Sequence, residues 1–248
     1  MPSFNKILVA NRGEIACRIQ RTAQALGYRT VAVFSDADAD ALHVRMADEA
    51  VNIGPAPAQQ SYLSIAAIID AARRTGADAI HPGYGFLSEN PKFALACREA
   101  GLTFIGPSPE AIELMGSKRL SKIAMLAAGV PCIDGYQGAE QDDASLGREA
   151  ARLGYPLMIK ASAGGGGRGM RLVQDASDLL AQIHTARSEA LNGFGSDELI
   201  LEQALIDPRH VDVQLFGAQH GNLLYLGDRD CPLQRRHQKV LEDPPSPA

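Results

Sequence analysis

Residues 157–173 read LMIKASAGGGGRGMRLV, two short apolar runs joined by a loop that contains five glycines. The two runs have the length and composition of strands, so residues 160–169 are predicted to form the loop of a long hairpin. Glycine lacks a Cβ, can take positive φ, and lets several backbone N–H groups face one anion. Lys160 and Arg168 place positive charge beside those groups, and this combination suits a polyphosphate.

Two common phosphate-binding motifs do not account for this loop. Gly164, Gly166 and Gly169 fit the spacing G-x-G-x-x-G of dinucleotide-binding proteins, but that motif opens a helix, and here a strand-like run follows. The lysine motif G-x-x-x-x-G-K-[ST] is absent from the sequence. A flexible linker is the remaining alternative, and the apolar runs and the cations beside the loop argue against it.

The composition is that of a globular chain with little net charge. Its 248 residues are enough for one large domain or two of ordinary size. A net charge of −5 argues against a general nucleic-acid-binding protein and confines any phosphate site to a local basic pocket. Cys17, Cys97, Cys132 and Cys231 form no C-x-x-C pair, so neither a zinc cluster nor a disulfide framework is predicted. Without a signal-peptide pattern or 18 consecutive apolar residues, a cytoplasmic protein with no membrane partner is expected.

The first part of the chain alternates strand-like and helix-like segments. Strands are predicted at 6–10, 30–34, 50–53, 77–81 and 102–105, with helices after the first strand, at 62–74 and at 91–100. This alternation indicates a doubly wound α/β domain with a parallel sheet and right-handed crossovers, ending near residue 115. Function in such sheets collects at the carboxyl ends of the strands, where residues 11–14 and 81–90 lie.

The second part of the chain mixes helices with strands of antiparallel type. Ser108 and Pro109 are predicted to start a helix that stops near Gly116. Further helices are predicted at 118–128, 141–153 and 176–191, and a strand at 199–202. The last two helices, this strand and the glycine hairpin belong to a small α+β lobe of about residues 130–204. Residues 211–216 and 223–226 are predicted to pair as antiparallel strands, and no helix or strand is predicted in the proline-rich residues 242–248.

Five stretches carry a more specific signal, and they occur in a fixed order. They are ANRGEIA at 10–16, HPGYGFLSEN at 81–90, LMGSK at 114–118, IKASAGGGGRGM at 159–170 and RDCPLQRRHQKV at 229–240. Together they closely resemble the first half of biotin carboxylase, the ATP-grasp component of biotin-dependent carboxylases, most similar to subunits of bacterial acyl-CoA carboxylases of the geranyl-CoA or methylcrotonyl-CoA type. The resemblance implies a biotin carboxylase N-terminal domain at residues 1–115 and an incomplete ATP-grasp domain at residues 116–248.

The resemblance also implies an activity and a set of site residues. Bicarbonate would be phosphorylated by MgATP, and the carboxyl group would pass to biotin on a carrier domain. Lysines and the glycine lid would hold the ATP phosphates, and these are Lys118, Lys160, Gly164, Gly165, Gly166, Gly167, Arg168 and Gly169. Glu202 and Leu205 match the adenine and ribose side, while His210, Gln234 and His237 match further nucleotide contacts. Lys239 matches the catalytic cation that approaches bicarbonate.

The implied cofactors are ATP, Mg²⁺ or Mn²⁺, and biotin as the carboxyl acceptor. The metal-binding glutamates of the family match nothing in residues 1–248, so no metal ligand is assigned and these residues by themselves are expected to be an inactive ATP-binding fragment. The expected partners are a biotin carboxyl carrier domain, a carboxyltransferase subunit and a second copy of the chain. Asp212 stands where the family often has a glutamate, which keeps the charge and shortens its reach. Two alternatives stay open, namely another ATP-grasp ligase such as a carbamoyl phosphate synthetase, and a nucleotide-binding module without chemistry.

Overall fold

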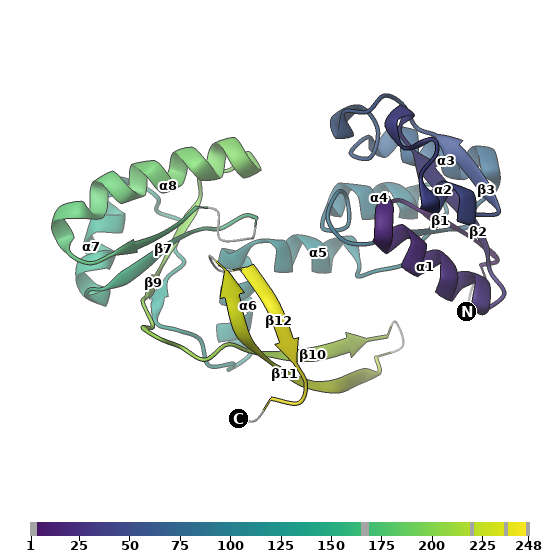
Figure 1. Ribbon diagram of the computed structural model, residues 1–248. Coiled ribbons are helices and arrows are strands. Elements are labelled where there is room, and N and C mark those ends of the chain that lie inside the picture. The colour runs from purple at the N-terminus through teal and green to yellow at the C-terminus, as the bar shows by residue number, and fades with distance from the viewer. Residues whose placement is uncertain (1–3, 165–168, 219–220, 236–237, 247–248) are drawn as a thin grey trace. The chain divides into compact units, whose positions relative to one another are not determined.

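A computed structural model describes residues 4–164, 169–218, 221–235 and 238–246 (Figure 1). The chain divides into two compact units, Met1–Gly116 and Ser117–Ala248. The first unit is an α/β domain with a parallel sheet, and the second contains two antiparallel sheets.

The sheet of the first unit has five strands in the order β3-β2-β1-β4-β5, and every neighbouring pair is parallel. The strands are β1 (Lys6–Val9), β2 (Arg29–Phe34), β3 (Glu49–Asn52), β4 (Ala79–His81) and β5 (Thr103–Phe104). All five lie within one or two residues of the predicted segments. The predicted doubly wound parallel sheet is therefore confirmed.

Five helices connect and follow these strands. They are α1 (Gly13–Ala25), α2 (Leu42–Met46), α3 (Ile65–Thr75), α4 (Pro91–Glu99) and α5 (Pro109–Gly116). Side-chain caps set three of the starts, because Ser64, Asn90 and Ser108 each accept a hydrogen bond from a backbone N–H of the first turn. The five-residue helix α2 was not predicted, since it is too short to show a helical period.

Alternation along β1 and β4 divides the core of this unit between the two faces of the sheet. Leu8 and Ile80 belong to a large apolar cluster with side chains of α3 and α4. Ile7 and Ala79, which point the other way, pack in a smaller cluster with Ala23 of α1. The strands are thus covered by helices on both faces, as a parallel sheet requires.

The second unit begins with a lobe built on a four-stranded sheet in the order β6-β9-β7-β8. Its elements are α6 (Lys118–Ala127), β6 (Gly135–Tyr136), α7 (Asp143–Leu153), β7 (Leu157–Ala161), β8 (Met170–Val173), α8 (Leu179–Phe194) and β9 (Leu199–Gln203). Strands β7 and β8 are antiparallel, which confirms the predicted glycine hairpin. The two-residue strand β6 was not predicted, and α8 follows a short 3-10 turn where one continuous helix was predicted.

One face of this lobe sheet is apolar and the other carries charge. Leu157 and Ile159 of β7 and Leu201 of β9 are fully buried in one cluster with side chains of α7 and α8. Because side chains alternate along a strand, Lys160 and Glu202 project from the opposite face. The charged face of the sheet therefore carries residues of the candidate site described below.

The remaining strands form a three-stranded antiparallel sheet in the order β10-β11-β12. They are β10 (Val211–Gly217), β11 (Leu223–Arg235) and β12 (Gln238–Asp243). The pairing of β10 with β11 confirms the predicted antiparallel pair. Two predictions here were wrong, because β11 runs nine residues beyond the predicted segment 223–226, and β12 completes a third strand where none was predicted.

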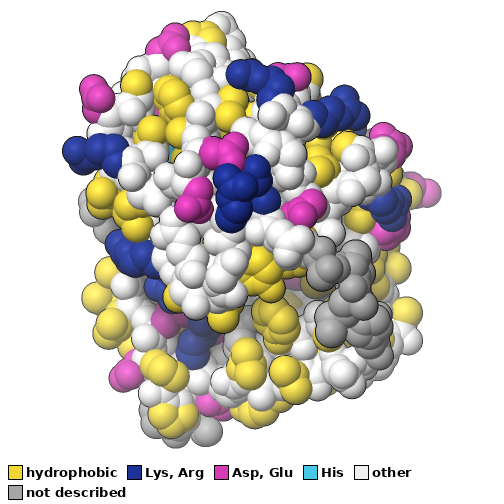
Figure 2. Space-filling view, turned by 90° about the vertical axis from the view of Figure 1, so that its right-hand side faces the viewer, with side chains coloured by type: hydrophobic (Ala, Val, Ile, Leu, Met, Phe, Trp, Pro, Cys, Tyr) yellow, Lys and Arg dark blue, Asp and Glu magenta, His cyan; other side chains and the backbone are white. Residues whose placement is uncertain are grey.

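Both signs of charge are present on the face of the molecule that Figure 2 shows. On the face shown in Figure 2, Lys and Arg side chains lie among Asp and Glu side chains, and hydrophobic groups are scattered between them. Among the helices of the described residues, none combines the length and the apolar character needed to cross a bilayer.

Candidate functional site

A buried carboxylate between two lysines lies at the centre of the site. Lys160 of β7 donates to one oxygen of Glu202 on β9, with an Nζ–Oε2 distance of 2.6 Å. Lys122 of α6 donates to the other oxygen, with an Nζ–Oε1 distance of 2.8 Å. Strands β7 and β9 are paired so that Met158 faces Glu202, which brings Lys160 diagonally across from the carboxylate.

The two lysines keep this carboxylate ionised. Burial by itself would raise the pKa of Glu202, but the hydrogen bonds from Lys122 and Lys160 and their charges outweigh it and hold that pKa below its usual value. The side chains of Lys122 and Glu202 are 7% and 11% exposed, so water contributes little to stabilising their two charges. The cluster carries one net positive charge, and Lys160 is its more exposed cation at 23%.

Lys118 and the described part of the glycine loop lie together. The Nζ of Lys118 donates to the carbonyl oxygen of Gly164, and its backbone N–H donates to the carbonyl of Ser162 at 2.8 Å. Gly164 and Gly169 both take positive φ, of 76° and 67°, as the predicted loop requires. A Cβ on Gly169 would come within 2.8 Å of the Cβ of Ala161, so a glycine also permits the close approach of the two strands.

A second polar network joins β10, β11 and β12. Gln234 Nε2 lies 2.8 Å from Nδ1 of His210, and Nε2 of His210 lies 3.2 Å from an oxygen of Asp212. Lys239 of β12 is hydrogen-bonded to the other oxygen of Asp212. This hydrogen bond is the main reason why the pKa of Lys239 is raised and the pKa of Asp212 is lowered. Both groups are therefore charged at neutral pH.

These groups meet around a cavity of about 1110 Å³ within the second unit. Five of the sequence-predicted residues line it, and these are Lys118, Lys160, Leu205, His210 and Gln234. Two more are one contact away, namely Gly164 on Lys118 and Glu202 on Lys160. Lys239 is two contacts away, since it binds Asp212, which in turn contacts His210. Gly165, Gly166, Gly167, Arg168 and His237 lie outside the described residues.

The sequence did not identify Lys122 or the role of Asp212. Lys122 follows Lys118 by four residues in α6, and this spacing places both amines on one side of a helix. Asp212 follows His210 by two residues, the spacing that puts two strand side chains on one face. The sequence did not predict the ion pair between Lys160 and Glu202.

Two protein families match the sequence, and together they cover nearly all of it. "Biotin carboxylase, N-terminal domain" matches residues 3–112, and "Carbamoyl-phosphate synthase L chain, ATP binding domain" matches residues 117–248. The methylcrotonoyl-CoA carboxylase subunit alpha, mitochondrial, of Oryza sativa subsp. japonica is 59% identical over 99% of this chain and 33% of the relative. The biotin carboxylase of Halalkalibacterium halodurans is 52% identical over 98% of this chain and 54% of the relative.

Solved structures agree with these relatives. A complex of biotin carboxylase with β,γ-ATP from Campylobacter jejuni superimposes with a TM-score of 0.95 at 47% identity, over 98% of this chain and 55% of that one. The biotin carboxylase domain dimer of the Hydrogenobacter thermophilus 2-oxoglutarate carboxylase, in complex with MgADP, ADP and bicarbonate, gives 0.93 at 48% identity, over 98% and 53%. The chain thus spans about a third of the carboxylase α subunits and about half of the biotin carboxylases that it matches.

Proposed function

We infer the function from one premise, that the chain belongs to the biotin carboxylase family, whose N-terminal domain and ATP-binding domain it contains. We propose that the protein takes part in the ATP-dependent carboxylation of biotin, the first half-reaction of a biotin-dependent acyl-CoA carboxylase. An oxygen of bicarbonate would attack the γ-phosphorus of ATP, ADP would leave, and the resulting carboxyphosphate would supply CO₂ to the ureido nitrogen of biotin, releasing phosphate. The supporting observation is the cavity lined by Lys118, Lys160, His210 and Gln234, which come from separate segments.

The cations of this cavity suit phosphoryl transfer. The reaction needs a polyphosphate to be aligned and its charge neutralised more than it needs covalent help. We assign the phosphates to Lys118 and Lys160, with the glycine loop, including Gly164 and Gly169, lying over them. Glu202 would act by holding the amine of Lys160 in place, since both of its oxygens are occupied by lysines.

The other end of the cavity suits the nucleoside and the second substrate. Leu205 and the two linked side chains His210 and Gln234 would contact the adenine and ribose side. Lys239 would approach bicarbonate, because it is a charged amine fixed beside this network by Asp212. The sequence assigns His237, Gly165, Gly166, Gly167 and Arg168 to the same site, and these assignments stay predictions.

No cluster of three oxygen ligands for magnesium is present among the described residues. Mg²⁺ takes oxygen ligands in octahedral geometry. Within the described residues, one group of three or more His, Cys, Asp or Glu side chains could hold a metal, and it offers one nitrogen, one sulfur and one carboxylate. We therefore assign no step of the reaction to a metal ligand in this part of the chain.

Binding of MgATP to residues 1–248, measured by isothermal titration calorimetry, tests the nucleotide site. Lys160→Ala should weaken binding by about tenfold or more, because a charge-assisted contact is worth about 1.5–3 kcal/mol. Lys92→Ala, an exposed lysine of α4 in the other unit, is the matched control and should bind as the wild type does. Equal affinity of both variants would remove Lys160 from the site, and no binding of MgATP by the wild type would reject the proposed site.

The chemistry is tested with the complete protein that contains these residues. Transfer of labelled bicarbonate to free biotin that depends on ATP would support biotin carboxylation. Formation of carbamoyl phosphate from bicarbonate, ATP and ammonia would instead support the alternative ligase, whose ATP-binding family also matches residues 117–248. ATP binding without either product would support a nucleotide-binding module.

We further propose partners by analogy with the relatives. The similar plant and animal proteins are α subunits of methylcrotonoyl-CoA carboxylase, and one similar structure is a dimer. A biotin carboxyl carrier domain, a carboxyltransferase subunit specific for methylcrotonoyl-CoA and a second copy of the chain are the corresponding partners here. A cytoplasmic location stays a prediction, since several relatives are mitochondrial forms.

A further inference from the structure

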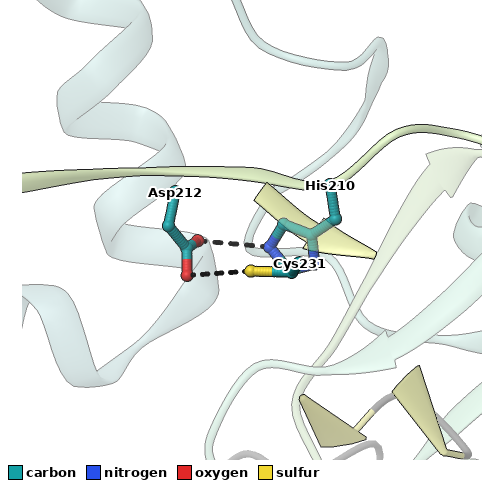
Figure 3. A group of neighbouring side chains, drawn as sticks. All are labelled: His210, Asp212 and Cys231. Atoms are coloured by element: carbon teal, nitrogen blue, oxygen red, sulfur yellow. Dashed lines mark hydrogen bonds and ion pairs between the residues drawn. The ribbon is translucent and has the colours of Figure 1, made fainter. Parts of the chain in front are cut away.

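Three side chains with metal-binding atoms converge at the junction of β10 and β11 (Figure 3). They are His210, Asp212 and Cys231, and their ligand atoms all lie within 4.8 Å of one another. His210 Nε2 is 3.2 Å from Asp212 Oδ1, and Cys231 Sγ is 3.6 Å from Asp212 Oδ2. The thiol is buried, while the imidazole is partly exposed.

The strand pairing fixes this arrangement. Val211 faces Asp230 in the antiparallel pair, and the N–H of Cys231 donates to the carbonyl of His210 at 2.9 Å, so Cys231 lies directly opposite His210. Asp212 is two residues after His210 and projects from the same face. The backbone ladder therefore holds the three side chains together without a ligand.

Two of the three separations between ligand atoms are close to those of a tetrahedral metal site. Zinc binds sulfur at about 2.3 Å and nitrogen or oxygen at about 2.0–2.2 Å, which places tetrahedral ligand atoms about 3.3–3.6 Å apart. The separations of 3.2 Å and 3.6 Å lie close to this range.

Neighbouring groups would support such a site. Gln234 lies 2.8 Å from Nδ1 of His210, the ring nitrogen that would not bind the metal. Metal binding at Nε2 puts the proton on Nδ1, and a rotated Gln234 amide accepts it through its oxygen. Lys239 holds the second oxygen of Asp212. His210 and Cys231 also line the large cavity, so a fourth ligand position would be open to it.

We propose that His210, Asp212 and Cys231 bind a divalent cation of the zinc class, with the fourth position open to the cavity. The thiol of Cys231 loses its proton to solvent as the metal–sulfur bond forms, so the thiolate and the carboxylate face the two charges of the ion and the one charge of Lys239. A set of one sulfur, one nitrogen and one oxygen favours zinc or cobalt over magnesium, which prefers oxygen. The site stands on its own geometry and does not require the proposed function.

Cobalt(II) titrated into residues 1–248 tests this site, because a thiolate bound to cobalt gives an intense near-ultraviolet absorption. The wild type should show this absorption at about one equivalent, Zn²⁺ should remove it, and excess Mg²⁺ should not. Cys231→Ser should abolish it, whereas Cys132→Ser, the matched thiol of the same unit that is not part of the cluster, should leave it unchanged. His210→Ala and Asp212→Asn should each weaken cobalt binding at least tenfold.

Three results would overturn the proposal. They are no thiolate absorption in the wild type, an absorption that survives in Cys231→Ser, and an absorption lost in Cys132→Ser. Circular dichroism of each variant verifies folding, and if Cys231→Ser does not fold, the same titration of His210→Ala decides, since unchanged cobalt affinity there would also reject the site. None of these measurements uses ATP, so their failure would leave the proposed function untouched.

Discussion

Replacing Lys122 by methionine tests how much the buried Lys122–Glu202–Lys160 cluster stabilises the lobe. Methionine has a similar length and no charge, so Lys122→Met removes the 2.8 Å hydrogen bond to Glu202 and leaves little space unfilled. Glu202 remains ionised against Lys160 at 2.6 Å. The variant therefore deletes one of two charge-assisted bonds to a buried carboxylate without leaving that carboxylate unpaired.

The expected loss of stability depends on which contacts of Glu202 remain in each variant. A hydrogen bond to a charged group contributes about 1.5–3 kcal/mol, so we expect Lys122→Met to destabilise the lobe by about 2 kcal/mol. Glu202→Gln leaves the amine of Lys122 buried without a counter-charge, and removing one partner of a buried pair costs about 3–5 kcal/mol. The two changes act on one contact, so the double variant should lose less than the sum of the single variants, by about 1–2 kcal/mol.

Hydrogen exchange of the β7 and β9 amides is the suitable assay, because a chain of two units has no single free energy of unfolding.

The stabilisation by Glu202 depends on pH with a definite sign. The folded pKa of Glu202 is lowered, so its stabilising contribution is fully present above the unfolded pKa of about 4.3 and is lost as the pH falls through the folded pKa. The difference in protection between wild type and Lys122→Met should therefore be full at neutral pH and shrink below about pH 4.

An exposed ion pair of the same unit provides the control. Arg148 and Glu140 lie 3.7 Å apart with side chains that are 68% and 73% exposed, so Arg148→Met should change protection by less than about 0.5 kcal/mol. If Lys122→Met at neutral pH matched this control, the cluster would not stabilise the lobe. A loss that stayed the same at low pH would mean that packing, and not charge, is responsible.

Three further outcomes are expected. Gly135→Ala should destabilise the lobe, since a Cβ there would lie 2.4 Å from a backbone carbonyl oxygen. Gly147→Ala, with no atom within 4 Å of its Cβ, should stabilise α7 by about 0.5–1 kcal/mol, and hydrogen exchange of the lobe amides compares the two variants. Cys132 is half-buried and should be alkylated by iodoacetamide in the native protein. Burial raises the pKa of Cys97 to about 12, so this thiol should react only after unfolding, and peptide mass spectrometry would distinguish the two. Burial opposes ionisation of the Asp38 carboxyl, but three hydrogen-bonding partners keep its pKa low. Asp38→Asn removes this charge from its partners and should destabilise the first unit by about 2 kcal/mol, as measured by hydrogen exchange.

Elements with a regular period were predicted well from the sequence. The parallel strands of the first unit are short apolar runs, and the two apolar strands of the β7–β8 hairpin are separated by a glycine-rich loop. Such features can be recognised in a short window of sequence. The continuation of β11 through residues 227–235 was missed because charged and polar residues interrupt its alternation. Its strand conformation comes from pairing with β10 on one side and β12 on the other, and such pairing is not visible in a local window.

The candidate site shows the same division. Lys118, Lys160 and the glycine loop could be predicted as site residues because they lie in short contiguous motifs. The partners of Glu202 are 42 and 80 residues away in the sequence, so the cluster depends on the register of two strands and the placement of a helix. A pattern of residue types gives the charges of such a site, but the fold decides which charges are paired.

The pairing of Lys160 bears on how the cavity would bind an anion. An anion at Lys160 competes with Glu202, whose carboxylate already lies 2.6 Å from the amine. Two unit charges about 4 Å apart interact by about 4 kcal/mol at an effective dielectric constant of 20, which would be a serious penalty if Glu202 lost its counter-charge. Lys122 remains on the other oxygen, so the carboxylate stays compensated when Lys160 turns toward the cavity. In the proposed site, Lys122 would thus let Glu202 hold Lys160 in position before a ligand binds and release it to the ligand afterwards.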